Sequence, residues 1–234
     1  MAAGFTTWTV LPHKPIQKLA ENLWHVEGTM PSGTIRRAMA VVRLGDGRLL
    51  LHNAIALDEN EMGEIDAFGE VAGILVPNAF HRQDAFIMKH RYPNAKVYCP
   101  AGAKGGVAKA VATDGTYADA PSDASVRVRH LDGFPGEGVV EVTSNDGVSA
   151  IFCDAVMNMS PQMKFPFSLL LAPLGRAAVP RATRWFFVKN KASFKADIER
   201  IAATDGFRRI LVGHGDNVEE NAAEALRVAA GDCG

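Results

Sequence analysis

The sequence has few of the features that distinguish disulfide-rich, nucleic-acid-binding or membrane proteins from ordinary globular ones. It has only three cysteines among 234 residues, an odd number at unrelated spacings, which argues against a disulfide framework and fits a reducing compartment. Its formal net charge is -1, so no overall excess of basic residues predicts nucleic acid or anionic lipid as a partner. Its apolar runs are shorter than the roughly 18 to 20 residues of a membrane span. We therefore expect no nucleic-acid partner and no membrane partner.

The N-terminal stretch "MAAGFTTWTVLPHKPIQKL" also lacks a charged start followed by an apolar block, so no secretory signal is expected. Together these absences predict a cytoplasmic protein. No Gly-x-Ser-x-Gly elbow occurs, which leaves a serine-hydrolase mechanism without support. What is present is ordinary for a globular chain: 47% hydrophobic and 22% charged residues, in a length that suits one large domain over residues 1–234.

The apolar patterns predict an α/β chain with two hairpin-containing halves. The hairpin at 38–54 turns at Asp46-Gly47 and the hairpin at 139–156 turns at Asp146-Gly147, pairs that readily take positive φ. Strand and helix patterns alternate after the first hairpin, which predicts parallel strands joined by a crossover helix. The other expected elements are strands at 23–29, 70–77, 95–100 and from 207, and helices at 57–69, 82–92, 193–204 and 218–230.

Polar clusters follow three of the expected strands. His81 and Asp84 follow the strand at 70–77, Asp154 follows "AIFC", and His214 follows "ILVG". In α/β proteins, ligands gather beyond the carboxyl ends of strands, where loops converge on a rigid frame. One histidine at a strand end is more often a hydrogen-bonded structural group, but three clusters in this order indicate a shared site.

Two of these clusters carry a specific resemblance. "AIFCDAVMN" resembles the segment of the metallo-β-lactamase superfamily that ends in a bridging aspartate, here Asp154. "RILVGHGDN" is similar to the late segment of that family whose histidine is a metal ligand, here His214. The resemblance spans roughly residues 20 to 225. It implies an α/β fold, a four-layer αβ/βα sandwich of two mixed β-sheets with helices outside.

The sequence departs from this family at the first metal motif. The family has His-x-His-x-Asp-His after a strand, but Asn78 and Phe80 stand at the first two histidine positions, and Arg82 and Gln83 replace Asp-His. The segment "HLDGFPGEGVVEVTSNDG" also lacks the family's Gly-His pair. The Pro-Asn-x-x-His element ending at His81 resembles an uncharacterised subgroup of the fold. We therefore expect neither the dinuclear zinc site nor β-lactamase activity.

The remaining donors leave two interpretations open. His81, Asp154 and His214 are a two-histidine, one-carboxylate set, which suits one zinc, iron or manganese ion, with Asp84 as a further ligand or a hydrogen-bond acceptor for His81. The chain would then be a mononuclear metal-dependent hydrolase acting on an unknown small molecule, with Asp154 holding the metal and orienting water. Alternatively, Arg82 brings a positive charge that disfavours a cation and could itself pair with Asp154. The chain would then be a metal-free, non-catalytic small-molecule-binding or interaction protein.

Four residues are candidates for substrate contact: Arg36, Arg37, Asn78 and Arg82. Arg36 and Arg37 precede a strand near the site and could clamp a carboxylate or phosphate, although a solvated loop is the simpler interpretation. The apolar segment at 161–180 carries four prolines, so it cannot be one continuous helix. We expect loop and short helix there, forming a surface for a homodimer or another partner.

Overall fold

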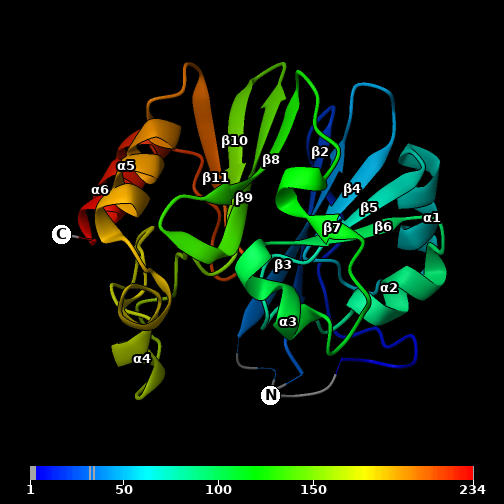
Figure 1. Ribbon diagram of the computed structural model, residues 1–234, viewed down its shortest axis with the longest axis horizontal. Helices are drawn as coiled ribbons and strands as arrows, with labels where there is room; N and C mark the ends of the chain where they lie inside the picture. The colour runs from blue at the N-terminus through cyan, green and yellow to red at the C-terminus, as the bar shows by residue number, and fades with distance from the viewer. Residues whose placement is uncertain (1–3, 32, 34, 234) are drawn as a thin grey trace.

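The computed structural model describes residues 4–31, 33 and 35–233, and places two β-sheets side by side with helices on their outer faces (Figure 1). The larger sheet has the strand order β1-β2-β3-β4-β5-β6-β7, antiparallel from β1 to β4 and parallel from β4 to β7. Its strands are β1 (Gln17–Ala20), β2 (Leu23–Thr29), β3 (Arg36–Arg43), β4 (Leu49–His52), β5 (Val71–Leu75), β6 (Lys96–Cys99) and β7 (Gly115–Thr116).

The smaller sheet has the order β11-β10-β9-β8 and is also mixed, because β10 pairs in parallel with β11 and antiparallel with β9. Its strands are β8 (Val126–Leu131), β9 (Phe134–Ser144), β10 (Gly147–Ile151) and β11 (Phe207–Leu211). The helices are α1 (Glu59–Phe68), α2 (Ala85–Arg91), α3 (Lys104–Val107), α4 (Phe167–Leu170), α5 (Lys191–Ala202) and α6 (Ala222–Gly231), with single helical turns at Ala101–Ala103, Tyr117–Asp119 and Thr183–Phe187.

The core has three apolar layers, which confirms the predicted sandwich. A central layer combines residues of both sheets, including Leu50 and Leu75 of the larger sheet and Val140 and Leu211 of the smaller one. A second layer lies between the larger sheet and α1 and α2, and a third lies between the smaller sheet and α5 and α6. Burying both faces of each sheet explains why the strands carry long apolar runs and not strict alternation.

Local signals account for most of the predicted elements. Both expected hairpins form, with Gly47 and Gly147 at positive φ. The side chain of Asp58 caps α1 by accepting from two backbone N–H groups, as the acidic start of that segment predicts. The strands β1, β7 and β8 were not expected, since the first two are very short and β8 carries three charged or polar side chains among its six residues.

The two sheets meet at the edge where the expected polar clusters lie. Ala38 of β3 donates its N–H to the carbonyl of Gly213, which follows β11, so the larger sheet is joined to the smaller one at this point. Within the described residues, no helix is both long enough and apolar enough to cross a membrane. Residues 1–3, which begin the stretch where no secretory signal is expected, lie outside the described residues.

Candidate metal centre

Three donor atoms from three strand ends converge at the junction of the sheets. His81 follows β5, Asp154 follows β10 and His214 follows β11. His81 Nε2 lies 3.3 Å from Asp154 Oδ1, His214 Nε2 lies 3.4 Å from the same oxygen, and the two nitrogens are 3.0 Å apart. The structure thus brings together the three side chains that the sequence places at separate strand exits.

The other nitrogen of each imidazole faces an oxygen. His214 Nδ1 lies 2.5 Å from the carbonyl oxygen of Arg36, which can only accept a hydrogen bond. His81 Nδ1 lies 3.2 Å from Asn53 Oδ1, and the orientation of that amide is fixed because Asn53 Nδ2 donates to the carbonyl of Ala38 at 2.7 Å. Both Nδ1 atoms therefore carry the hydrogen, and both Nε2 atoms present lone pairs to each other when the rings are neutral.

Such an arrangement needs a positive charge between the nitrogens, either a proton or a metal ion. Zinc binds nitrogen and oxygen donors at about 2.0 to 2.2 Å, and the donors of a tetrahedral site then lie about 3.3 to 3.6 Å apart. The observed separations of 3.0 to 3.4 Å are close to this spacing. Acceptors on both Nδ1 atoms are also the usual outer contacts of metal-binding histidines. The donor set therefore fits a single divalent ion.

The second oxygen of Asp154 faces away from the histidines, toward Asn78. Asn78 Nδ2 donates to Asp154 Oδ2 at 2.8 Å and lies 3.2 Å from Glu137 Oε2, so one amide lies between two carboxylates. Asn78 Oδ1 accepts from the backbone N–H groups of Phe80 and His81 at 2.8 and 3.1 Å. Asn78 thus orients Asp154 and holds the turn that delivers His81.

Glu137 is a site residue that the sequence did not single out. It lies in β9, is fully buried, and accepts from the backbone N–H groups of Cys153, Asp154 and Ala155 at 2.8 to 2.9 Å. It stands in "PGEG", inside the segment that lacks the family's Gly-His pair. The available signal was an acidic residue between two glycines at the start of an apolar strand, where an ionisable group is expected to have a partner.

Burial and charge act in different directions on these groups. Burial raises the pKa of Glu137 to about 8, with the nearby Asp154 charge adding to the effect. Burial also opposes ionisation of Asp154, but charge and hydrogen bonds from His81 and His214 lower its pKa overall. The pKa of His214 is raised, because the hydrogen bond and charge of Asp154 outweigh the effect of burial. The cluster is therefore an anionic carboxylate that favours positive charge beside it.

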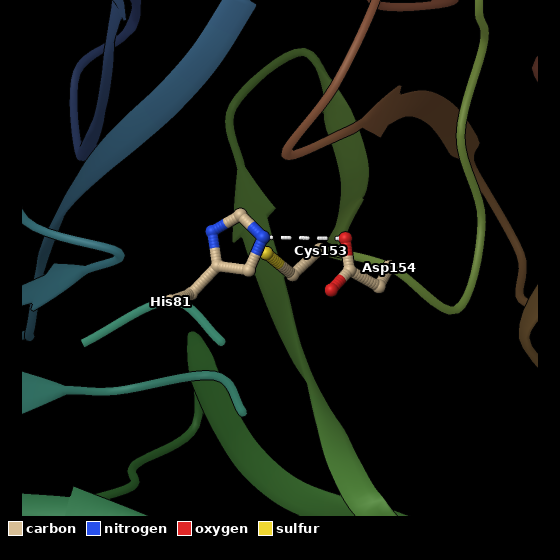
Figure 2. Close-up of side chains that lie close together, drawn as sticks. All are labelled: His81, Cys153 and Asp154. Carbon is tan, nitrogen blue, oxygen red and sulfur yellow. Dashed lines mark ion pairs between the residues drawn. The ribbon is translucent and has the colours of Figure 1, made fainter. Parts of the chain in front are cut away.

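Cys153 is a second group near the donor cluster that the sequence did not single out. Its Sγ, the Asp154 carboxylate and a His81 ring nitrogen all lie within 4.8 Å of one another (Figure 2). Burial, with Asp154 and Glu137, raises the pKa of the thiol well above its usual range. The thiol is neutral unless a cation is bound beside it, since a metal deprotonates a coordinating thiol.

The other predicted site residues are engaged elsewhere. Asp84, expected as a further ligand, forms a buried ion pair with Arg37 and accepts from the N–H of Ala56 at 3.1 Å. Arg36 is paired with Glu27 and Asp216 at 2.8 and 2.7 Å, so its backbone carbonyl and not its guanidinium faces the cluster.

Arg82 lies at the centre of the alternative, metal-free interpretation. Its guanidinium donates to the carbonyl of Gly106 in α3. The groups that contact the Asp154 carboxylate are Asn78, His81 and His214 within the described residues. Arg82 thus binds α3, and the two imidazoles lie beside Asp154 in its place.

The similarity of this chain to known proteins lies in its fold. No family model matches the chain, and neither does any curated protein. Among solved structures, DIM-1 metallo-β-lactamase exposed to ceftazidime is 12% identical with a TM-score of 0.62, over 97% of this chain and 100% of that chain.

Two further solved structures are similar over nearly their whole length. FIM-1 from Pseudomonas aeruginosa, a metallo-β-lactamase in its mono-zinc form, is 11% identical with a TM-score of 0.60, over 95% of this chain and 96% of that chain. VMB-1 at pH 5.5 is 12% identical with a TM-score of 0.59, over 95% and 98%. At identities this low, the similarity concerns the fold alone.

Proposed function

We propose that this chain, which has the metallo-β-lactamase fold, is a hydrolase that holds one divalent metal ion on His81, Asp154 and His214. The observation that carries the proposal is the 3.0 Å approach of two histidine Nε2 atoms whose Nδ1 atoms both face oxygen acceptors. Two histidines and one carboxylate suit zinc, iron or manganese. The substrate class is a small molecule that carries a hydrolysable bond.

Residues around the three donors hold them in position for this chemistry. When bound, a divalent ion polarises a carbonyl or phosphoryl oxygen and makes a coordinated water more acidic. Asn53 and the Arg36 carbonyl set the orientation of the two imidazoles. Asn78 holds the distal oxygen of Asp154, and Glu137 fixes the backbone turn that carries it.

The same contacts support one ion and not two. The amide nitrogen of Asn78 lies between Asp154 Oδ2 and Glu137 Oε2, at 2.8 and 3.2 Å, and its two hydrogens are directed to these oxygens. The remaining capacity of Glu137 is used by three backbone N–H groups. The Asn78 side of Asp154 is thus already hydrogen-bonded, and we expect a stoichiometry of one ion per chain.

The test is metal analysis of protein purified without chelator or nickel resin, followed by thermal unfolding with and without chelator. We expect about one equivalent of metal and a lower melting temperature after its removal, because the ion binds the folded state. His81→Ala and His214→Ala should each abolish uptake, while His90→Ala, at an exposed histidine of α2, should not. Protein without stoichiometric metal, and not stabilised by added zinc, iron or manganese, would contradict the hydrolase proposal.

A metal-free binding protein is the second candidate, because a proton can also occupy the 3.0 Å space between the two Nε2 atoms. A proton on His214 Nε2 can be donated toward His81 Nε2 or Asp154 Oδ1 and closes the cluster as a hydrogen-bonded network. In that case chelator should leave the melting temperature unchanged, and His214→Ala should destabilise the fold without affecting metal content.

A further inference from the structure

The chain between Asp154 and Asp197 has a charge very different from the rest of the molecule. It contains no acidic residue and seven basic ones, in a protein whose net charge is -1. The basic residues are Lys164, Arg176, Arg181, Arg184, Lys189, Lys191 and Lys195. The expectation of no attraction to anionic lipid rested on the charge of the whole chain, and this segment departs from that average.

The same segment exposes large apolar side chains. Phe165 is 80% exposed, Trp185 58% and Phe186 61%, and Phe167 and Leu169 of α4 are also exposed. Figure 1 shows α4 projecting from the body of the molecule, below α5 and α6. The backbone bond from Arg181 to the carbonyl of Ala172 ties the two parts of the segment together. Apolar groups gathered in this way mark an interaction surface.

Several of the positive charges in the segment are free to meet a partner. Arg176 is paired with Asp232 at 2.6 Å, and Lys195 lies 3.9 Å from Glu199. Lys164, Lys189 and Lys191 are exposed, and in the described part of the chain none of them lies within ion-pair distance of a carboxylate. These three lysines flank α4 and the turn at Thr183–Phe187, beside the exposed aromatic rings.

The combination of exposed apolar side chains and exposed lysines indicates the kind of partner. A symmetric dimer formed through this surface would bring basic side chains of one copy against basic side chains of the other, which is unfavourable. Aromatic and aliphatic side chains next to lysines are instead the composition of proteins that bind at a lipid–water interface. We propose that the 155–196 segment binds an anionic lipid surface, with its exposed apolar side chains in the interface and its lysines at the headgroups.

This surface reaches the candidate metal centre. The ring of Phe80, the residue before His81, contacts the ring of Phe187 edge-on, with centroids 5.5 Å apart. Thr183 Oγ1 donates to the backbone carbonyl of Asp154 at 2.9 Å. A lipid surface bound here would therefore lie beside the donor cluster, although the binding itself does not depend on a metal.

The test is co-sedimentation of the full chain with two kinds of vesicle. One kind is phosphatidylcholine alone, and in the other about a third of the lipid is phosphatidylglycerol. We expect retention on the anionic vesicles only, and its loss at about 1 M salt, because screening removes the attraction of the lysines. Equal binding to both vesicle types, or none to either, overturns the proposal.

Matched variants separate the contributions. Replacing Lys164, Lys189 and Lys191 by glutamine should weaken partitioning by about fivefold for each charge removed. The same change at the exposed Lys96, Lys104 and Lys109 serves as the control and should have much less effect. Phe165→Ser with Phe167→Ser and Leu169→Ser should also release the protein, at an unchanged melting temperature, since these side chains are exposed.

Two outcomes with the variants contradict the proposal. If the lysine variant and its control bind anionic vesicles equally, the segment is not the site of attachment. If sedimentation velocity shows a stable dimer that Phe165→Ser dissociates, the surface is occupied by a second copy of the chain. Neither outcome bears on metal content, so the hydrolase proposal is tested separately.

Discussion

His81 Nε2 and His214 Nε2 lie 3.0 Å apart although 133 positions separate the two residues in the chain. His81 follows β5 of the larger sheet and His214 follows β11 of the smaller one. The cluster can therefore form only when the two sheets are packed against each other. An ion bound at this point would link the sheets and stabilise the packed state.

Asn53 is expected to set metal affinity without touching the ion. Asn53→Gly removes the acceptor for His81 Nδ1 but keeps the positive φ of 54° that this position requires. Loss of such an outer contact typically costs about 10- to 100-fold in metal affinity, measured here by competition with a chromophoric chelator. Asn60→Gly, on an exposed part of α1, would show how much a new glycine alone contributes. Unchanged affinity would remove Asn53 from the site.

The buried pair of Arg37 and Asp84 is expected to serve stability and not metal binding. Asp84→Asn leaves the guanidinium buried without its counter-charge, which should reduce the free energy of unfolding by about 3 kcal/mol in urea titrations. Glu64→Gln, in the exposed pair with Lys18, should cost less than about 1 kcal/mol. If Asp84→Asn abolishes metal uptake at full stability, Asp84 is a ligand after all.

Gly213 is expected to be intolerant of any side chain. A Cβ there would lie 2.7 Å from Cys153 Sγ and 2.9 Å from its Cα, so Gly213→Ala should destabilise the protein by about 1 to 3 kcal/mol. Gly63→Ala in α1 meets no atom within 4 Å and should instead stabilise by about 0.5 to 1 kcal/mol. Urea titrations that show equal effects for both would contradict the close packing of Gly213 on Cys153.

His25 is expected to make stability depend on pH. Burial lowers its pKa from 6.5 to about 4, the charge of Glu27 partly opposes this effect, and the charge of Lys14 adds to it. Between these values the unfolded chain binds more protons than the folded one, so the free energy of unfolding rises with pH. The contribution of His25 to the free energy of unfolding is fully present above pH 6.5, and about 3 kcal/mol of it is lost as the pH falls to 4.

The measurement for His25 is the free energy of unfolding in urea at pH values from 4 to 7. His25→Gln should flatten the curve, because glutamine does not titrate. His90→Gln, at an exposed position, is the matched control. A curve for His25→Gln that is as steep as that of the unchanged protein would show that other groups cause the pH dependence.

Most of the fold could be predicted because its elements depend on local signals. The Asp46-Gly47 and Asp146-Gly147 turns define the two hairpins, and Asp58 marks the start of α1. The short β7 could not be predicted, since two residues carry no periodicity and its pairing with β6 is a tertiary contact.

The candidate site could be predicted only in part. Strand ends pointed to His81, Asp154 and His214, whose donor atoms the structure brings within 3.4 Å, while their role as ligands stays a prediction. The partners of Asp84 and the position of Glu137 could not be predicted. Both depend on which groups are buried opposite each other across the packed elements.

The hydrogen bond from Thr183 to the Asp154 carbonyl has a thermodynamic consequence. The apolar basic segment and the donor cluster share this contact, which gives a route by which ordering of one can change the free energy of the other. Such coupling is reciprocal. If occupancy of the donor cluster strengthens attachment of the segment to a surface, attachment must tighten occupancy by the same factor, and the protein would then load its ion most readily where it is attached.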